Sequence, residues 1–583
     1  MIRIAVVGGG PKSLFALLAL NDLIPPGSRS RIRVDVYDPH PPGSGSVWRE
    51  AQPQALRLNV NAGIVDASSS LTSENFANWV HHAAPELSGE KYPPRALVGR
   101  YLREQFEFLR QHGNVTVSHR PYVVTGVERL GTQWMLKGPF GSSTYEEVLL
   151  ATGHGLGDAS PRRPPPLELL PGALNPHPLI GNYSSLTTAA IRPEQSVWIR
   201  GAALTAYDVA LLLTEGRGGS WQGLTSGAQL GKLRYIPSGR EPQRITFASR
   251  SGLLMDPKSE TVSPAITACL ERFKPQLWQW GRPHQATSDA GRLAGLWAIL
   301  LRCAQECAQI MGVQTSAVTL WRTALTGVSV AAESGAACMT SSPGPANLAT
   351  EDWLPEDWAP AELLRHSLLA NHFLAPLTTG WLWARVWSGL YPELVAVMDR
   401  SSRSRQDWRQ FLRVAGNLER FAFGPPELTA RKLLALFDSG ILHMTPASEE
   451  PEPGVVLIDA VTPSPGVLGA PAPDGDPVSG LYLGLLLDGH VSVRPGERGL
   501  LTDRDATCIA SDGSRTQSLA AVGRPTEDPT LGHDTLNRSL HGEHRLWAQR
   551  IAGHVALNAA KPSPATGPLP KQPTPAEESV LKE

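Results

Sequence analysis

A glycine-rich turn near the start of the chain has the residue types and spacing of a phosphate-binding loop. An apolar strand is expected over residues 2–7, and it runs through Gly8 and Gly10 into an apolar helix that begins near Ser13. Gly8 permits a tight turn, and Gly10 lets the backbone approach a phosphate closely. The helix start offers free N–H groups and the positive end of its dipole. The pattern predicts a site for the pyrophosphate of a dinucleotide.

An acidic residue follows the second expected strand of this unit. Asp38 comes directly after residues 34–37, where a carboxylate can accept a hydrogen bond from a ribose 2′-hydroxyl. A carboxylate at this point favours FAD or NAD over NADP. Pro11, Lys12 and Ser13 open the helix and are expected to border the pyrophosphate, with the small Ser13 in place of the third glycine.

A later strand, expected over residues 146–150, ends in Ala151-Thr152-Gly153. This ending recurs where the chain of two-dinucleotide flavoproteins leaves the FAD domain. We therefore expect Ala151, Thr152 and Gly153 to lie beside FAD.

A second nucleotide-binding unit is expected farther along the chain. A strand over residues 196–200 leads into a turn at Gly201 and then a helix, so Gly201, Leu204 and Thr205 are candidate contacts of a second nucleotide. Ala203 stands where a close-approach glycine is usual, and its methyl group is expected to push the pyrophosphate outward.

The next strand of this second unit, over residues 244–247, leads into Ser249 and Arg250. A hydroxyl and a guanidinium there suit the 2′-phosphate of NADP through charge-assisted hydrogen bonds. A solvated turn is the alternative interpretation. Together with Asp38, this contrast predicts FAD at the first site and NADPH at the second.

Length and charge limit the class of protein. A chain of 583 residues should form several domains, and a net charge of −1 gives no basic field to attract nucleic acid. We expect a small-molecule substrate, no nucleic-acid partner, no membrane span and a cytoplasmic location, because no long apolar run and no signal peptide is evident. The oligomeric state stays open.

The predicted fold class is α/β, with two dinucleotide-binding Rossmann-like domains and an additional helical region. The FAD domain is expected to be discontinuous, with the NADP domain inserted in it. The expected divisions are 1–157 (FAD domain, first part), 158–340 (NAD(P) domain), 341–478 (helical and loop-rich substrate or cap region), 479–560 (return to the FAD domain) and 561–583 (disordered tail).

The five cysteines contain no Cys-x-x-Cys pair, so neither a metal site nor a disulfide framework is expected. Cys303 and Cys307 lie four residues apart on an expected helix, where two reduced helix residues are favoured over a redox pair. Five tryptophans recur at helical spacing and are expected mainly in a core, with a substrate-pocket wall as the alternative. They are Trp278, Trp280, Trp381, Trp383 and Trp387.

Further motifs occur in a recognisable order along residues 1–550. They are Trp48 through Asn59-Val60-Asn61, Tyr92-Pro-Pro-Arg95 with Gly99, Ala151–Gly153 with His154, Arg200-Gly-Ala-Ala-Leu-Thr205, Pro237-Ser-Gly-Arg-Glu241, Gly523-Arg524-Pro-Thr526 and Asp534-Thr-Leu-Asn-Arg538. With the glycine turns, these motifs resemble the large FAD/NAD(P)-binding proteins related to class B flavin monooxygenases. That group includes nitrosuccinate synthases, which oxidise the amino group of aspartate.

The resemblance implies an FAD-dependent, NADPH-using monooxygenase. It would consume O₂ and hydroxylate the nitrogen of an amine or amino acid through a flavin C4a-hydroperoxide. A flavin oxidoreductase without oxygen insertion and a non-catalytic flavin-binding protein are the alternatives. One departure is that residues 178–186 lack the histidine of the Phe-x-Gly-x-x-x-His motif usual in class B monooxygenases.

The resemblance also supplies candidate site residues. It places Trp48, Asn59 and Asn61 beside the flavin ring, where they are the candidate catalytic residues. The alternatives are a core or loop position for Trp48 and capping of a backbone turn for the two asparagines. The resemblance also implies a helix start near Asp534 and Thr535 that faces the pyrimidine edge of the flavin, with either residue as its cap.

Overall fold

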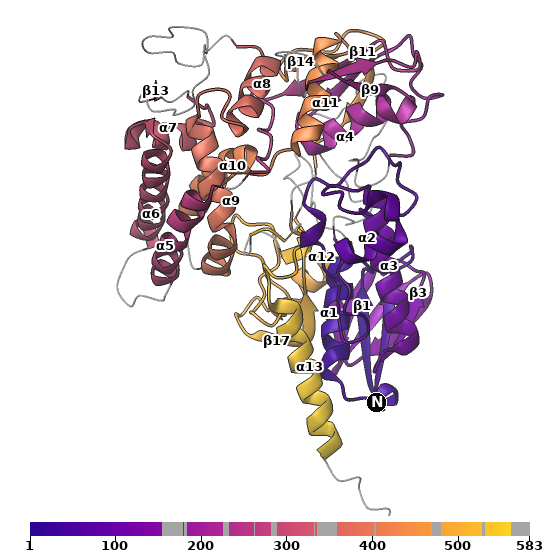
Figure 1. Cartoon of the computed structure of the whole chain (residues 1–583). Helices are drawn as coiled ribbons and strands as arrows, with labels where there is room; N and C mark the ends of the chain where they lie inside the picture. The colour runs from indigo at the N-terminus through magenta and orange to yellow at the C-terminus, as the bar shows by residue number, and fades with distance from the viewer. Residues whose placement is uncertain are drawn as a thin grey trace, which may run out of the picture.

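The structure is a computed structural model, shown in Figure 1, in which two α/β bodies lie beside a body of helices. It describes residues 1–153, 179, 183–224, 232–261, 263–281, 289–330, 333–334, 358–401, 404–462, 465–468, 480–526, 531–533 and 535–560. Among these residues, no helix combines the length and the apolar character that crossing a membrane requires.

The first sheet is built from both ends of the chain. Its strands run in the order β16-β17-β7-β1-β2-β3, and all neighbours are parallel except β16 and β17. The bounds are β1 Ile2–Val7, β2 Ile32–Tyr37, β3 Thr116–Arg120, β7 Glu147–Leu150, β16 Thr507–Ile509 and β17 Arg515–Ala521. Near-continuous apolar sequence in β1 and β7 fits strands that are covered on both faces.

Helices cover one face of this sheet, and a three-stranded antiparallel sheet with one short helix covers the other. The helices are α1 Pro11–Leu23, α2 Phe76–Ala83, α3 Arg95–His112 and α13 Glu543–Ala560; the opposite cover is β4 Gly126–Leu130, β5 Gln133–Gly138, β6 Gly141–Tyr145 and α12 Gly480–Leu487. Buried Glu147 on β7 anchors α13, because it accepts hydrogen bonds from Arg550 at 2.6 Å and from the indole of Trp547 at 3.1 Å.

The second sheet is fully parallel, in the order β14-β11-β8-β15. Its strands are β8 Ser196–Arg200, β11 Arg244–Ser249, β14 Leu442–Pro446 and β15 Val456–Asp459. The helices α4 Leu204–Leu213, α8 Pro360–Asn371 and α11 Glu427–Asp438 share its core, and the hairpin β9 Ser220–Gly223 with β10 Leu233–Ile236 lies beside them. The α/β class with two Rossmann-like sheets is confirmed.

The expected division of the chain needs one correction. Residues 341–478 are expected to form a helical and loop-rich region, yet β14 and β15 complete the second nucleotide-binding sheet. The run 456–459 reads Val-Leu-Ile-Asp and is fully buried, so it is a short strand of a covered parallel sheet. The prolines around it hid this signal, because proline punctuates loops more often than strands.

The third body consists mainly of helices packed around one apolar core. They are α5 Pro264–Gly281, α6 Asp289–Ile310, α7 Ala317–Thr326, α9 Thr379–Met398 and α10 Arg405–Ala422, with the two-residue strands β12 Val313–Gln314 and β13 Glu333–Ser334. Trp381, Trp383 and Trp387 lie in this core and Trp280 packs against it, as expected. Trp278 is instead 51% exposed.

One buried ion pair joins the two nucleotide-binding bodies. Arg95, the first residue of α3, places its two terminal nitrogens 2.6 and 3.1 Å from the carboxylate oxygens of Asp208 on α4. Its Nε donates to the Arg57 carbonyl at 2.9 Å, and the Tyr183 hydroxyl donates to Asp208 at 3.3 Å. Burial lowers the pKa of Arg95, but Asp208 more than offsets this and the pKa is raised. Burial also raises the pKa of Asp208, and the charge of Arg95 opposes this shift.

We expect the substitution Arg95→Met to lower the free energy of unfolding by about 3–5 kcal/mol, because it leaves Asp208 buried and unpaired. Urea denaturation followed by tryptophan fluorescence measures this change. Adding Asp208→Asn should restore part of the loss. The exposed pair Arg192–Glu194 is the control, and Arg192→Ala should change stability by less than about 0.5 kcal/mol. An Arg95→Met cost as small as that of Arg192→Ala would refute this role.

Candidate functional site

The first glycine turn has the geometry that a close-approaching phosphate needs. Gly8 has φ +101° and donates its N–H to the Tyr37 carbonyl at 2.9 Å. A Cβ on Gly8 would lie 2.2 Å from the Ala151 oxygen, so this position requires glycine. A Cβ on Gly10, by contrast, would meet only the Gly45 Cα at 3.9 Å. The protein therefore leaves space beside Gly10 on the side where a ligand would approach.

The start of α1 is suited to an anion. Pro11 is its first residue, and no side chain caps the helix. The Ser13 hydroxyl donates back to the Gly10 carbonyl at 2.7 Å, so it does not occupy the N–H groups of the first turn. The side chain of Lys12 lies against Gly523, at the end of β17. These N–H groups and the positive dipole end face the same edge of the sheet as the glycine turn.

Asp38 is held beside that turn. Its two carboxylate oxygens accept the N–H groups of Gly9 at 2.7 Å and His40 at 2.8 Å, and a carboxylate can accept further hydrogen bonds from a ribose. At the same edge, Ala151 donates to the Val7 carbonyl at 2.8 Å. The neighbouring Thr152 hydroxyl is 2.9 Å from that of Tyr482, and Gly153 has φ +64°. The residues present thus fit a dinucleotide with free ribose hydroxyls.

The second turn has a similar form but is less crowded, because a Cβ on Gly201 would meet its nearest atoms only at 3.5 Å. Gly201 has φ +111° and donates to the Ala248 carbonyl at 2.8 Å. Ala203 precedes α4 with extended backbone, so Leu204 and Thr205 are the first two helical residues. The strand order of this sheet corresponds to half of a dinucleotide-binding fold, whose ligand binds at the carboxyl ends of the strands.

Ser249 is the last residue of β11, and Arg250 follows it at that carboxyl edge. Ser249 is buried, with its hydroxyl 3.3 Å from that of Ser251, whereas Arg250 is exposed. An exposed guanidinium at this edge is compatible with a phosphate contact.

The three candidate catalytic residues lie on loops of the first body. Trp48 is half-buried and packs against the core of the first body, and its carbonyl lies so close to α3 that a Cβ on Gly99 would be 1.8 Å away. Asn61 accepts the Gly63 N–H at 2.9 Å and caps a short 3-10 turn. Asn59 accepts a hydrogen bond on its main-chain oxygen from the ammonium of Lys258.

The expectation that a helix starts near Asp534 and Thr535 is wrong. Asp534 lies outside the described residues, and the Thr535 hydroxyl accepts the Asn537 N–H at 3.0 Å in a turn. The helix of this region, α13, begins only at Glu543. A hydroxyl that bonds to the backbone two residues ahead favours a turn over a helix, which explains the difference.

Sequence reasoning missed two cations that lie beside this site. Lys258 follows the second sheet in sequence, and burial lowers its pKa to about 8. Arg385 lies on α9, where burial lowers its pKa to about 10 and Glu427 opposes the shift only in part. Neither Lys258 nor Arg385 forms an ion pair within the described part of the chain. Both have neutral oxygen partners instead.

A short series of contacts connects the two cations. Arg385 donates to the side-chain oxygen of Asn371 at 3.3 Å, and the Asn371 amide donates to the Pro257 carbonyl at 3.1 Å, next to Lys258. The ring of Trp381 lies 4.6 Å from the Arg385 guanidinium. One weak signal of this site is present in the sequence, because Arg385 is a lone charge within the apolar, tryptophan-rich start of α9. All three bodies thus contribute to this region.

Comparison with known proteins agrees with a dinucleotide-binding site at the first glycine turn. Residues 5–155 match the family model described as FAD-NAD(P)-binding. The nitrosuccinic acid synthase of Aspergillus oryzae is 30% identical over 277 residues, which is 43% of this chain and 40% of that protein. An L-aspartate N-monooxygenase (nitrosuccinate-forming) of Streptomyces davaonensis is 29% identical over 309 residues, 44% of each chain. The chain thus spans about two fifths of the length of these relatives.

Among solved structures, OTEMO in complex with FAD and NADP aligns with 96% of this chain and 84% of its own, at 9% identity and a TM-score of 0.39. A double mutant of a flavin monooxygenase from Stenotrophomonas maltophilia aligns with 46% of this chain and 63% of its own, at 19% identity and a TM-score of 0.28. The family expectation is confirmed at the level of the N-terminal domain: residues 5–155 are an FAD-NAD(P)-binding domain, in a chain similar to nitrosuccinate-forming N-monooxygenases.

Proposed function

We propose that the protein is an FAD-dependent, NADPH-using monooxygenase that hydroxylates the amino nitrogen of a small acidic amino acid of the aspartate type. The relative from Streptomyces davaonensis is an L-aspartate N-monooxygenase, and the relative from Aspergillus oryzae is a nitrosuccinic acid synthase. The observation that carries the proposal to this chain is the pair Lys258 and Arg385, two desolvated cations that form no ion pair among the described residues and of which only Arg385 is partly offset by a carboxylate, that of Glu427. A buried cation favours a ligand that brings the missing negative charge.

The two glycine turns divide the cofactors between them. Gly8, Gly10, Ser13 and Asp38 would hold FAD, and Asp38 would accept a ribose hydroxyl. Leu204 and Thr205 would receive the pyrophosphate of NADPH, and Ser249 with Arg250 its 2′-phosphate, the guanidinium through charge-assisted hydrogen bonds. When bound, reduced FAD activates O₂ and NADPH supplies the reducing equivalents.

The chain's own residues would bind and orient the substrate. Lys258 and Arg385 would each pair with a carboxylate and thereby fix the position of the amino group between them. The main-chain oxygen of Asn59 holds the Lys258 ammonium in place. Trp48 would help to exclude water, and the amide N–H groups of Asn59 and Asn61 would serve as donors beside the reacting atoms. The side-chain oxygen of Asn61 is already used in its cap.

Oxygen transfer to L-aspartate is the direct test. We expect the full-length protein, supplied with FAD, NADPH and L-aspartate, to consume O₂ and form a product heavier by at least one oxygen atom, measured by an oxygen electrode and mass spectrometry. Succinate, which lacks the amine, should give no such product. NADPH oxidation that yields only hydrogen peroxide with acidic and neutral amino acids would instead favour an oxidoreductase without oxygen insertion.

Lys258 should give the affinity for an acidic substrate a characteristic pH dependence. Its ammonium is charged below pH 8 and neutral above it, so KM for L-aspartate should rise as the pH increases above about 8. Deprotonation of the substrate amine acts oppositely and should raise kcat over the same range. Steady-state kinetics at several pH values separates the two effects.

Two substitutions test this assignment. Lys258→Gln should raise KM by about 10–150-fold near pH 7, since a charge-assisted contact of roughly 1.5–3 kcal/mol is lost. Lys258→Arg should remove the rise of KM above pH 8, because its charge persists. Lys91→Gln is the control, since Lys91 is exposed and already pairs with Glu260 at 2.8 Å. An unchanged KM in Lys258→Gln would exclude this role.

The geometry of the first glycine turn predicts that a bulky side chain at Gly10 prevents flavin binding without unfolding the protein. We expect Gly10→Val to yield colourless protein, because the new side chain would occupy the space left for the pyrophosphate without striking the protein itself. Flavin absorbance per chain and the circular dichroism spectrum measure binding and folding separately. Gly416→Val on α10, where a Cβ meets nothing within 4 Å, is the matched control and should keep its flavin. Full flavin occupancy in Gly10→Val would argue against FAD at this turn.

A further inference from the structure

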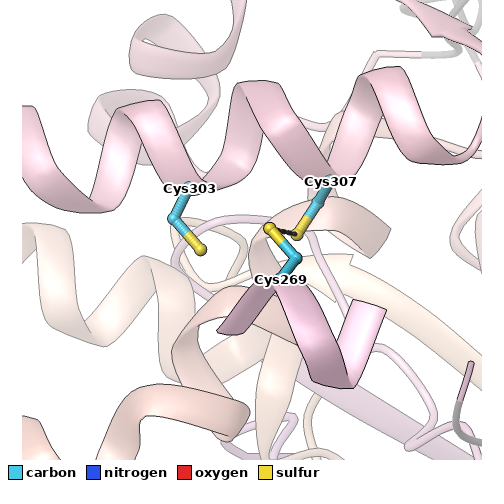
Figure 2. A group of neighbouring side chains, drawn as sticks. All are labelled: Cys269, Cys303 and Cys307. Carbon is cyan, nitrogen blue, oxygen red and sulfur yellow. Dashed lines mark hydrogen bonds between the residues drawn. The ribbon is translucent and has the colours of Figure 1, made fainter. Parts of the chain in front are cut away.

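Three cysteines that are distant in sequence converge between α5 and α6, as Figure 2 shows. Cys303 and Cys307 lie one turn apart on the same face of α6, and Cys269 faces them from α5. Their sulfur atoms all lie within 4.8 Å of one another, with Cys269 and Cys307 at 4.0 Å. All three residues are fully buried. The spacing of the cysteines did not reveal this group, because Cys269 lies on a different helix.

We propose that these three sulfurs bind one thiophilic metal ion, Zn²⁺ in the cell. Zinc–sulfur bonds of about 2.3 Å in tetrahedral geometry place neighbouring sulfurs about 3.8 Å apart, close to the separation found here. Thiolate ligands favour zinc and other soft ions over magnesium or calcium. The two helices therefore already present the donors at distances that small rotamer changes would complete.

A carboxylate at the edge of the group supplies a fourth ligand. Glu306 Oε2 lies 3.7 Å from the Cys269 sulfur, and the guanidinium of Arg272 holds the same oxygen at 2.7 Å. Glu306 and Arg272 are both partly exposed, so they mark the side from which an ion would enter. Arg272 also offsets part of the negative charge that three thiolates and a carboxylate would place around one Zn²⁺.

Metal binding would exchange protons for the ion. A cysteine binds a metal through its thiolate, whereas a thiol with an ordinary pKa of about 8.5 is mostly protonated at neutral pH. On binding, each thiol that becomes a ligand releases its proton to solvent, and its sulfur donates an electron pair to the ion. Nothing is oxidised or reduced. Binding should therefore strengthen as the pH rises.

A metal ion at this site would cross-link α5 to α6 within the helical body. Next to Cys269, Leu270 packs so closely on α9 that a Cβ at Gly389 would lie 2.4 Å from its Cδ1. Because α9 carries Arg385, fixing α5 against α6 supports the helix that presents this cation. A four-ligand site of this kind is typical of structural zinc.

Cadmium reports thiolate ligands directly. The full-length protein is purified with reductant, its zinc is measured by plasma mass spectrometry, and the chelator-treated protein is titrated with Cd²⁺. We expect one zinc per chain and a saturable sulfur-to-cadmium charge-transfer absorption. Cys303→Ala should weaken Cd²⁺ binding at least tenfold and reduce this absorption. Cys508→Ala, which removes a buried cysteine in the first body, is the matched control and should change neither.

Glu306→Gln tests the site without disturbing the core. Its side chain lies at the edge of the group, so folding should persist if Cys303→Ala proves unstable. We expect about tenfold weaker Cd²⁺ binding with an unchanged charge-transfer absorption, because no sulfur is lost. Absence of saturable Cd²⁺ binding, equal losses in Cys303→Ala and Cys508→Ala, or a Cys269–Cys307 disulfide in the metal-free purified protein would each overturn the proposal.

Discussion

The buried pair Arg95–Asp208 sets the relation between the two nucleotide-binding bodies. Asp208 lies near the start of α4, which follows β8, and Arg95 opens α3, which leads back into β3, so each marks the carboxyl edge of its own sheet. Because dinucleotides bind at these edges, one ion pair positions both cofactor sites at once. Removing these charges from water is costly, and the two contacts between Arg95 and Asp208, with the Arg57 carbonyl and the Tyr183 hydroxyl, offset that cost. The relative position of the two proposed cofactor sites therefore depends on this junction.

Local patterns were sufficient for the parts of the site that follow strand–turn–helix chemistry. Gly8 needs a positive φ and Gly10 needs an open side, and both needs are visible in the sequence as glycine after an apolar strand. Asp38 and Gly201 can be predicted from the local sequence for the same reason. Gly8, Gly10 and Asp38 lie within about thirty positions of one another, and Gly201 acts within its own strand–turn–helix unit, so no knowledge of the distant chain is required.

The sequence did not predict which residues from distant parts of the chain lie together. Lys258, Arg385 and Asn59 come from three separate bodies, and nothing in their own neighbourhoods announces a shared site. The same holds for Cys269, which faces Cys303 only because α5 packs on α6. Strand β15 was hidden for a different reason, since its four buried residues lie among prolines. Local propensity indicates how a segment folds but not which distant segment lies beside it.

The poor solvation of Lys258 and Arg385 is both unfavourable in the free protein and the proposed basis of selectivity for acidic substrates. Within the described part of the chain their hydrogen-bond partners are neutral oxygens, the Asn59 carbonyl and the Asn371 amide, so desolvation is poorly compensated and both pKa values fall. A carboxylate would compensate far better than a neutral group, because charge-assisted hydrogen bonds are about twice as strong. A neutral amine would leave both cations unpaired. The destabilisation in the free protein is therefore also the proposed source of selectivity for acidic substrates, since specificity depends on the difference between the two cases.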